Sequence, residues 1–199
     1  MDARRALLTG LFDHAAMFPP ASLPLDEALA EDDRARASQH AWLLGRFVVP
    51  DGVVVDDRDV AIVGAGRERQ GDVVYVEGET KLRCGGARIP PVDEVAAFVR
   101  GCRERGVVFK ATAGLHHAYP TDAGEHGFLN LLAAATFGDE EDALRAPRGS
   151  FELDERSFRW RSREAGPDEL VRVRGTLFHS IGSCSFFEPV GELEELGIL

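Results

Sequence analysis

The clearest shortage in this sequence is lysine: of its 23 lysine and arginine residues, only Lys81 and Lys110 are lysine. A guanidinium group stays protonated at any ordinary pH, whereas an ε-amine can lose its proton, attack a carbonyl carbon and form a Schiff base. Each lysine lies in an extended run that opens into small residues and glycine, which is how a strand delivers a side chain to a loop-lined site. We interpret both as candidate catalytic residues, and the alternative is a chance drift of composition towards arginine.

Cysteine is also scarce. The three thiols, Cys84, Cys102 and Cys184, form no C-x-x-C pair, which argues against a disulfide framework or a structural zinc site and indicates reduced thiols. Cys102 falls within a helical pattern and is expected to pack in the core. Cys84 and Cys184 lie in Gly/Ser-rich motifs, where the fit of a small residue is a more ordinary explanation than a nucleophilic role.

Long apolar runs are missing, since none reaches the roughly 18 residues that a membrane span needs. The formal net charge of −11 disfavours nucleic acid and anionic membrane as partners and leaves a small-molecule substrate. The amino-terminal stretch turns polar too early for a secretory signal, so we expect a cytoplasmic protein. With 199 residues, 44% of them hydrophobic, the chain can form one domain with a real core.

Strand-like and helix-like patterns alternate, which predicts an α/β fold with a parallel sheet. Strands are expected at 12–18, 47–50, 73–76, 81–84, 107–113 and 177–181, and helices at 25–39, 92–105 and 127–137. The segment 190–199 is expected to close the chain as a helix or turn. Residues 139–175 are charged and lack a clean period, so we expect a surface excursion within a single domain spanning 1–199.

Four segments, in chain order, resemble deoxyribose-phosphate aldolase, a class I aldolase on a (β/α)8 barrel. Residues 13–22 are similar to the family's first-strand D-H-T-x-L-K-P-x-A-T, and 81–86 (KLRCGG) to the Schiff-base strand K-T-S-T-G-F. Residues 109–115 (FKATAGL) resemble V-K-A-S-G-G-I, and 181–185 (IGSCS) resemble I-G-A-S-x. The runs 110–117 and 182–189 are also similar to a group of uncharacterised bacterial proteins, which implies no function.

The resemblance implies that Lys81 is the Schiff-base lysine and that Lys110 lowers its pKa. It also implies that the backbone of the turn at Gly182, Ser183 and Ser185 holds a substrate phosphate. Independently, two nearby ammonium groups repel, which drives one of them towards the neutral, nucleophilic amine. Successive parallel strands separated by one helix lie side by side, so the two lysines are expected to share one site. The other expected binding residues surround the same mouth: Asp13, His14, Arg83, Thr112, His116, His117 and His126.

The family pattern has three more strands between Val49 and Lys81, including an acidic residue that relays protons, but only about thirty residues intervene here. We therefore expect an incomplete, parallel (β/α) barrel-like sheet of the TIM/aldolase type with about six strands instead of eight. The proton relay stays unassigned. Open sheet edges need cover, which predicts a homodimer with residues 47–77 at or near the contact.

These features predict a Schiff-base lyase or aldolase that acts without a cofactor on a small phosphorylated or carboxylated carbonyl compound. One alternative is a non-catalytic barrel remnant that binds a ligand or assembles. Another is a metal-dependent enzyme with Asp13, His14, His116 and His126 as ligands, although the chain has no H-x-H or H-E-x-x-H spacing.

Overall fold

Eight strands form one mixed sheet that nearly closes into a barrel. The computed structural model describes all residues, 1–199. Around the barrel the strand order is β5-β4-β3-β2-β1-β11-β7-β6. The strands are β1 (Phe12–His14), β2 (Leu44–Pro50), β3 (Val60–Gly64), β4 (Arg67–Gln70), β5 (Val73–Val76), β6 (Lys81–Arg83), β7 (Phe109–Thr112) and β11 (Phe178–Ser183).

The two ends of the sheet meet where β5 runs into β6. A single bridge joins Glu77 to Lys81, and the backbone N–H of Gly78 donates to the carbonyl oxygen of Lys81 at 3.0 Å. The pairs β3–β4 and β4–β5 are antiparallel, and the other pairs in this sheet are parallel. The parallel strands direct their carboxyl ends to one mouth of the barrel.

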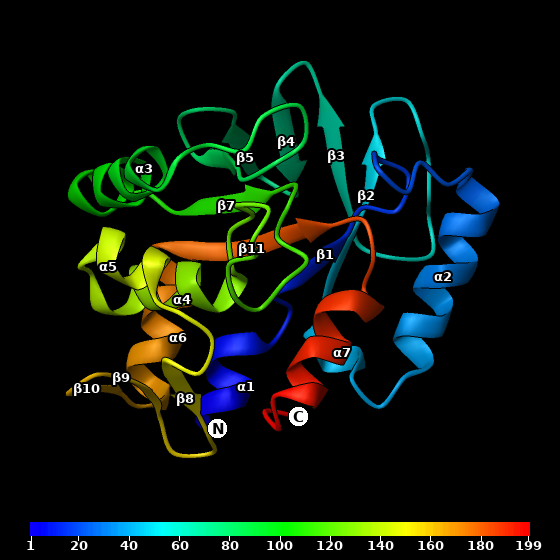
Figure 1. Ribbon diagram of the computed structural model, residues 1–199. Coiled ribbons are helices and arrows are strands. Elements are labelled where there is room, and N and C mark those ends of the chain that lie inside the picture. Colours follow the sequence, from blue (N-terminus) through cyan, green and yellow to red (C-terminus); the bar gives the residue numbers. More distant parts are fainter.

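Helices pack around this sheet, with α2 on one side and α3, α4, α5 and α6 on the other (Figure 1). Their bounds are α1 (Ala3–Leu8), α2 (Leu25–Ala37), α3 (Val92–Arg105), α4 (Phe128–Phe137), α5 (Glu140–Arg145), α6 (Pro167–Thr176) and α7 (Phe187–Glu195), with a 3₁₀ turn at Ala41–Leu43. No helix combines the length and the apolar character that crossing a membrane requires.

Helix α3 shows how local sequence fixes these elements. It starts after Pro91 with Asp93 and Glu94 in its first turn, where acidic groups favour the positive end of the helix dipole. It ends at Gly106, whose φ of +63° suits a residue without a side chain, and whose N–H bonds back to the last turn. The βαβ unit β6–α3–β7 that results places the two lysine strands side by side.

The expectation of an incomplete sheet of about six strands is wrong. Residues 60–76 form the antiparallel meander β3–β4–β5, which supplies strands without intervening helices. Its turns are tight because Ala65 and Gly66 have φ of +50° and +73°, and Gly71 has φ of +59°, the conformations that two-residue hairpin loops require. The short segment between Val49 and Lys81 therefore contains enough strands to continue the barrel.

This meander supplies the strands whose absence led us to expect a homodimer, and the oligomeric state itself stays a prediction. Residues 47–77 were expected at a contact because open edges between Val49 and Val73 would need a partner. In the structure these residues belong to β2–β5 and complete the sheet within one chain. No unpaired gap is left in the middle of the barrel for a second copy to cover.

The charged stretch 139–175 is more than the expected surface excursion. It contains α5, most of α6 and a separate antiparallel sheet of β8 (Phe151–Leu153), β9 (Phe158–Trp160) and β10 (Arg163–Ala165). Phe151, Phe158 and Trp160 are buried and join the main core, while the arginines beside them face solvent. The sheet lies beside α1 and α6 at one end of the molecule (Figure 1).

Candidate active site

Four charged side chains meet inside the barrel: Lys81, Lys110, Asp13 and Glu68. The two lysines come from adjacent parallel strands and are direct register partners, as Lys81 on β6 faces Lys110 on β7. Asp13 comes from β1 and Glu68 from β4, on either side of β2 and β3. All four are almost completely buried. Buried charges are tolerated only when they are paired, and these groups pair with one another.

Glu68 connects the two lysines. Its Oε2 lies 3.1 Å from Nζ of Lys81, and its Oε1 accepts a hydrogen bond from Nζ of Lys110. On its other side, Lys110 donates to Oδ2 of Asp13 at 2.8 Å. The arrangement is an alternating chain of charge, Asp13–Lys110–Glu68–Lys81, whose formal charges sum to zero.

Asp13 is the most firmly held member of this chain. Its Oδ2 also accepts from Ser180 Oγ at 2.6 Å and from Gln70 Nε2 at 2.9 Å, and its Oδ1 accepts from the backbone N–H of Arg46 at 2.7 Å. Burial alone would raise the pKa of Asp13, but the charge and hydrogen bond of Lys110, together with the hydrogen bonds from Ser180 and the Arg46 backbone, lower it below its ordinary value of 3.8.

Lys110 stays protonated. Burial alone would lower its pKa, but the carboxylates of Asp13 and Glu68 outweigh burial and raise the pKa above its ordinary value. Lys110 is also completely inaccessible, whereas the side chain of Lys81 keeps 6% of its surface exposed. Lys110 is therefore a fixed buried cation, and Lys81 is the amine that a ligand can reach.

A cavity of about 620 Å³ opens at the carboxyl ends of the parallel strands. Lys81 and Glu68 line it, whereas Lys110 and Asp13 lie behind them and do not. Its wall also includes four residues expected from the sequence, namely Arg83, Thr112, His116 and Gly182. The carboxyl-end mouth is where parallel barrels place their chemistry.

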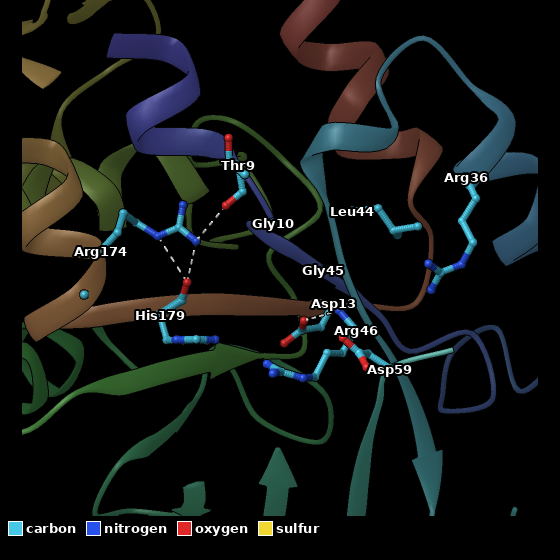
Figure 2. A pocket seen from close by; sticks show the side chains of 11 residues that line it. Thr9, Gly10, Asp13, Arg36, Leu44, Gly45, Arg46, Asp59, Arg174 and His179 are labelled. Atoms are coloured by element: carbon cyan, nitrogen blue, oxygen red, sulfur yellow. Dashed lines mark hydrogen bonds between the residues drawn. The ribbon is translucent and has the colours of Figure 1, made fainter. Parts of the chain in front are cut away.

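A second cavity, also of about 620 Å³, lies at the opposite mouth, near the amino ends of the strands. Figure 2 shows Arg174, His179, Arg46 and Asp13 around it. The guanidinium group of Arg174 donates its hydrogen bonds to backbone carbonyls, those of Leu7, Thr9, Phe178 and His179. Neither lysine nor Glu68 lines this second cavity, so we take the carboxyl-end cavity as the candidate active site.

The remaining residues expected at the site have other partners. His14 faces α2, where its Nδ1 lies 3.2 Å from Asp32, because neighbouring strand residues point to opposite faces and Asp13 takes the inner one. His117 pairs with Glu192 at 2.6 Å, and His126 bonds the carbonyl of Pro90 at 2.7 Å. None of these three histidines lines the cavity.

The expected anion-binding turn is only partly available. Gly182 lines the cavity, but the hydroxyl of Ser183 is buried and donates to the carbonyl of Ser185 at 2.6 Å. Neither Ser183 nor Ser185 lines the cavity. Arg83 is the better anion partner, because its side chain is half exposed and its nearest carboxylate, Glu77, is 4.0 Å away.

The metal hypothesis has no matching geometry. Asp13, His14, His116 and His126 lie in four different surroundings, and no group of three or more His, Cys, Asp or Glu side chains is placed to hold a metal ion. Cys84 is fully buried and does not line the cavity, and its burial raises the pKa of the thiol to about 12.

Glu68 was missed by the sequence reasoning. It lies in the strand Arg67–Gln70, where the exposed and buried residues alternate but every side chain is polar, so no hydrophobic pattern marks the strand. The available signal was the pair of tight turns around it, Gly64-Ala65-Gly66 and Gly71-Asp72, which is typical of a β-meander.

Two glycines, Gly85 and Gly114, allow the loops on either side of Lys81 to approach each other closely. A Cβ added at Gly85 would lie 2.8 Å from Cα of Gly114, and one added at Gly114 would lie 2.9 Å from Cα of Gly85. The loops that follow β6 and β7 therefore touch backbone to backbone, which explains why both lysine motifs run into small residues. Gly114 also has φ of +69°.

We expect Gly85→Ala to destabilise the protein by about 1–3 kcal/mol, because the new methyl group must push the two loops apart. Gly101→Ala is a matched control within α3, where the new Cβ meets only the flexible end of Arg105 at 3.4 Å. This control is expected to stabilise by roughly 0.5–1 kcal/mol. Urea unfolding of both variants measures the difference, and equal stabilities would contradict the loop contact.

Comparison of the chain with protein-family models, with curated proteins and with solved structures found no match.

Proposed function

We propose that this protein is a Schiff-base lyase or aldolase that acts on a small carbonyl compound carrying a phosphate or carboxylate. The observation that supports this most directly is the position of Lys81. Its amine reaches a cavity and lies 3.1 Å from a buried carboxylate, Glu68, which can take its proton. Glu68 fills the role of the proton relay that the sequence left unassigned.

Glu68 gives Lys81 a proton acceptor at the cavity wall. Moving one proton from Lys81 to Glu68 spans 3.1 Å and leaves the formal charge of the four groups at zero. Lys110 cannot release a proton as easily, because two carboxylates raise its pKa.

The chemical steps follow from these positions. Glu68 accepts a proton from Lys81, and the neutral amine adds to the carbonyl carbon of the substrate. Glu68 then returns its proton to the hydroxyl group of the adduct, which leaves as water and produces a protonated imine. The imine withdraws the electron pair of the adjacent carbon–carbon bond as that bond breaks, and Glu68, the carboxylate next to Nζ of Lys81, takes the proton of the substrate hydroxyl group that becomes the released carbonyl. Glu68 returns this proton to the carbon of the resulting enamine, and water then hydrolyses the imine, which frees Lys81 and the second product.

Arg83 is the group that we expect to bind the anionic part of the substrate. It follows Lys81 by two residues on β6, so both side chains leave the same face of the strand about 7 Å apart along it. Both line the cavity. A ligand with its carbonyl carbon at Lys81 can therefore place a phosphate or carboxylate at Arg83.

Borohydride trapping tests the proposal. With glyoxylate, pyruvate and glyceraldehyde 3-phosphate as probes, we expect a reduced adduct on the peptide that contains Lys81, and Lys81→Arg should abolish it. Because the chain has only two lysines, mass mapping of the adduct is unambiguous. Arg145→Lys supplies a control, since residue 145 is exposed and reports the labelling of an ordinary lysine.

Labelling of Lys81 no faster than that of the lysine at position 145, or labelling confined to the terminal amine, would contradict the proposal. Either result would favour a barrel that binds a ligand without transforming it.

A further inference from the structure

A second reactive group lines the same cavity. The loop after β11 carries Cys184 and the loop after β7 carries His116, and both residues belong to the cavity wall. Sγ of Cys184 lies 3.8 Å from Nε2 of His116, within the reach of a sulfur hydrogen bond. Cys184 and His116 are 68 residues apart in the sequence, so only the barrel fold brings them together.

Glu188 completes this group. It lies in the first turn of α7, and its Oε2 is 3.1 Å from Nδ1 of His116. The approach is close but not aligned as a hydrogen bond, so in the resting state it acts as a charge contact. A carboxylate at Nδ1 favours the tautomer with its proton on that nitrogen, and Nε2 is then free to accept the proton of the thiol.

The thiol of Cys184 differs from the other two. Burial raises its pKa and the charge of Glu188 adds to this, while the backbone N–H groups of Ala21 and of Cys184 itself act in the opposite direction. It is therefore a neutral thiol at rest, which needs a base in order to attack. Cys84 is fully buried, and Cys102 donates to the carbonyl of Glu79 at 3.7 Å, so neither has both a base and a cavity.

We propose that Cys184 is an acyl-accepting nucleophile, with His116 as its general base and Glu188 as a positioning residue. The nucleophile, the base and a group that orients the base are arranged as covalent acyl transfer requires. The cavity limits the substrate to a small ester or thioester. This activity is independent of imine formation at Lys81.

The acyl step is balanced without any cofactor. His116 takes the proton from Sγ as the sulfur bonds to the acyl carbon, and the carbonyl electrons move to oxygen. When the carbonyl re-forms, the bond to the leaving alcohol or thiol breaks, and His116 returns the proton to that leaving group. Water then attacks the acyl-cysteine while His116 takes one of its protons; the bond between the acyl carbon and Sγ breaks, the carboxylic acid is released, and His116 returns the proton to Sγ.

Acetylation by p-nitrophenyl acetate tests this proposal. We expect a burst of about one nitrophenolate per chain and one acetyl group on the Cys184 peptide, both absent in Cys184→Ala. His116→Gln should slow the burst by about 100-fold, the usual contribution of a general base. Cys102→Ala is the control, because Cys102 is buried away from the cavity.

The role of Glu188 has its own readout. Glu188→Gln should lower the maximal rate of the acetylation burst and leave the ester concentration at half-maximal rate unchanged, because Glu188 holds His116 in position and does not line the cavity. Cys184→Ser, which preserves side-chain size, separates loss of the thiol from a folding defect when its circular dichroism matches wild type. An acetyl group on Lys81 or the terminal amine, or a burst unchanged in His116→Gln, would overturn the proposal, whatever the outcome at Lys81.

Discussion

Replacing Lys110 with methionine is expected to cost about 3–5 kcal/mol of stability. Methionine has a similar volume but no charge, so Asp13 and Glu68 would lose the cation that they share inside the barrel. Arg145→Met is the matched control. It removes an exposed pair with Glu141, 3.8 Å apart, and is expected to change stability by less than about 1 kcal/mol. Urea unfolding at neutral pH measures both variants.

The pH dependence of this variant provides a second check. In the wild type, Lys110 lowers the pKa of Asp13, so the stability from this pair is present above the ordinary Asp pKa and is lost as pH falls through the lowered value. Without Lys110, burial raises the pKa of Asp13, and acid then relieves an unpaired charge. Between about pH 7 and 4 we expect Lys110→Met to gain stability relative to wild type. A constant difference would contradict the buried-charge explanation.

The meeting of Lys81 and Lys110 could be predicted from the sequence because it depends on local rules. An amphipathic helix with a glycine end separates two short strands, and right-handed crossover places such strands side by side. The structure pairs Lys81 directly with Lys110. The places of Arg83 and Thr112 in the cavity wall could be predicted in the same way, since each lies two positions after a lysine on the same strand.

The partner of the lysines could not be found in this way. Glu68 lies on a strand whose inner face is polar, and hydrophobic periodicity detects strands only when one face is apolar. Its place beside Lys81 depends on the closure of the sheet, which brings the end strand β5, and with it the neighbouring strand β4, next to β6 at the other end. That contact is not local in the sequence, and its only trace was the glycine spacing of two tight turns.

The histidines show a different limit. His14 follows Asp13 directly, and strand alternation allows only one of the two to face inward. The sequence does not decide which, and the barrel interior took the carboxylate because Lys110 needs a counter-charge there. His116 and His117 also point in different directions, one toward Cys184 and the other toward Glu192. Position near a strand end predicts the region of a loop residue, and packing decides its direction.

Replacing Glu68 with glutamine is expected to slow imine formation at Lys81 by about 10²–10⁴-fold. Glutamine keeps the shape of the side chain but accepts no proton, so the Lys81 ammonium group loses its route to the neutral amine. Lys110 keeps Asp13 as its partner, and the fold is therefore expected to survive. Borohydride trapping with glyoxylate over time measures the rate, and circular dichroism confirms the fold.

Glu125→Gln is the matched control for this experiment. Glu125 lines the same cavity, but its contacts are with Thr121 and His117 and include neither lysine. It therefore changes the charge of the cavity by the same amount without touching the proposed proton path, and its trapping rate should stay within about twofold of wild type, since rim charges act weakly through solvent. Equal slowing by both variants would assign the effect to overall cavity charge. Normal trapping in Glu68→Gln would show that Lys81 loses its proton by another route, and Glu68 would then only pair the two lysines.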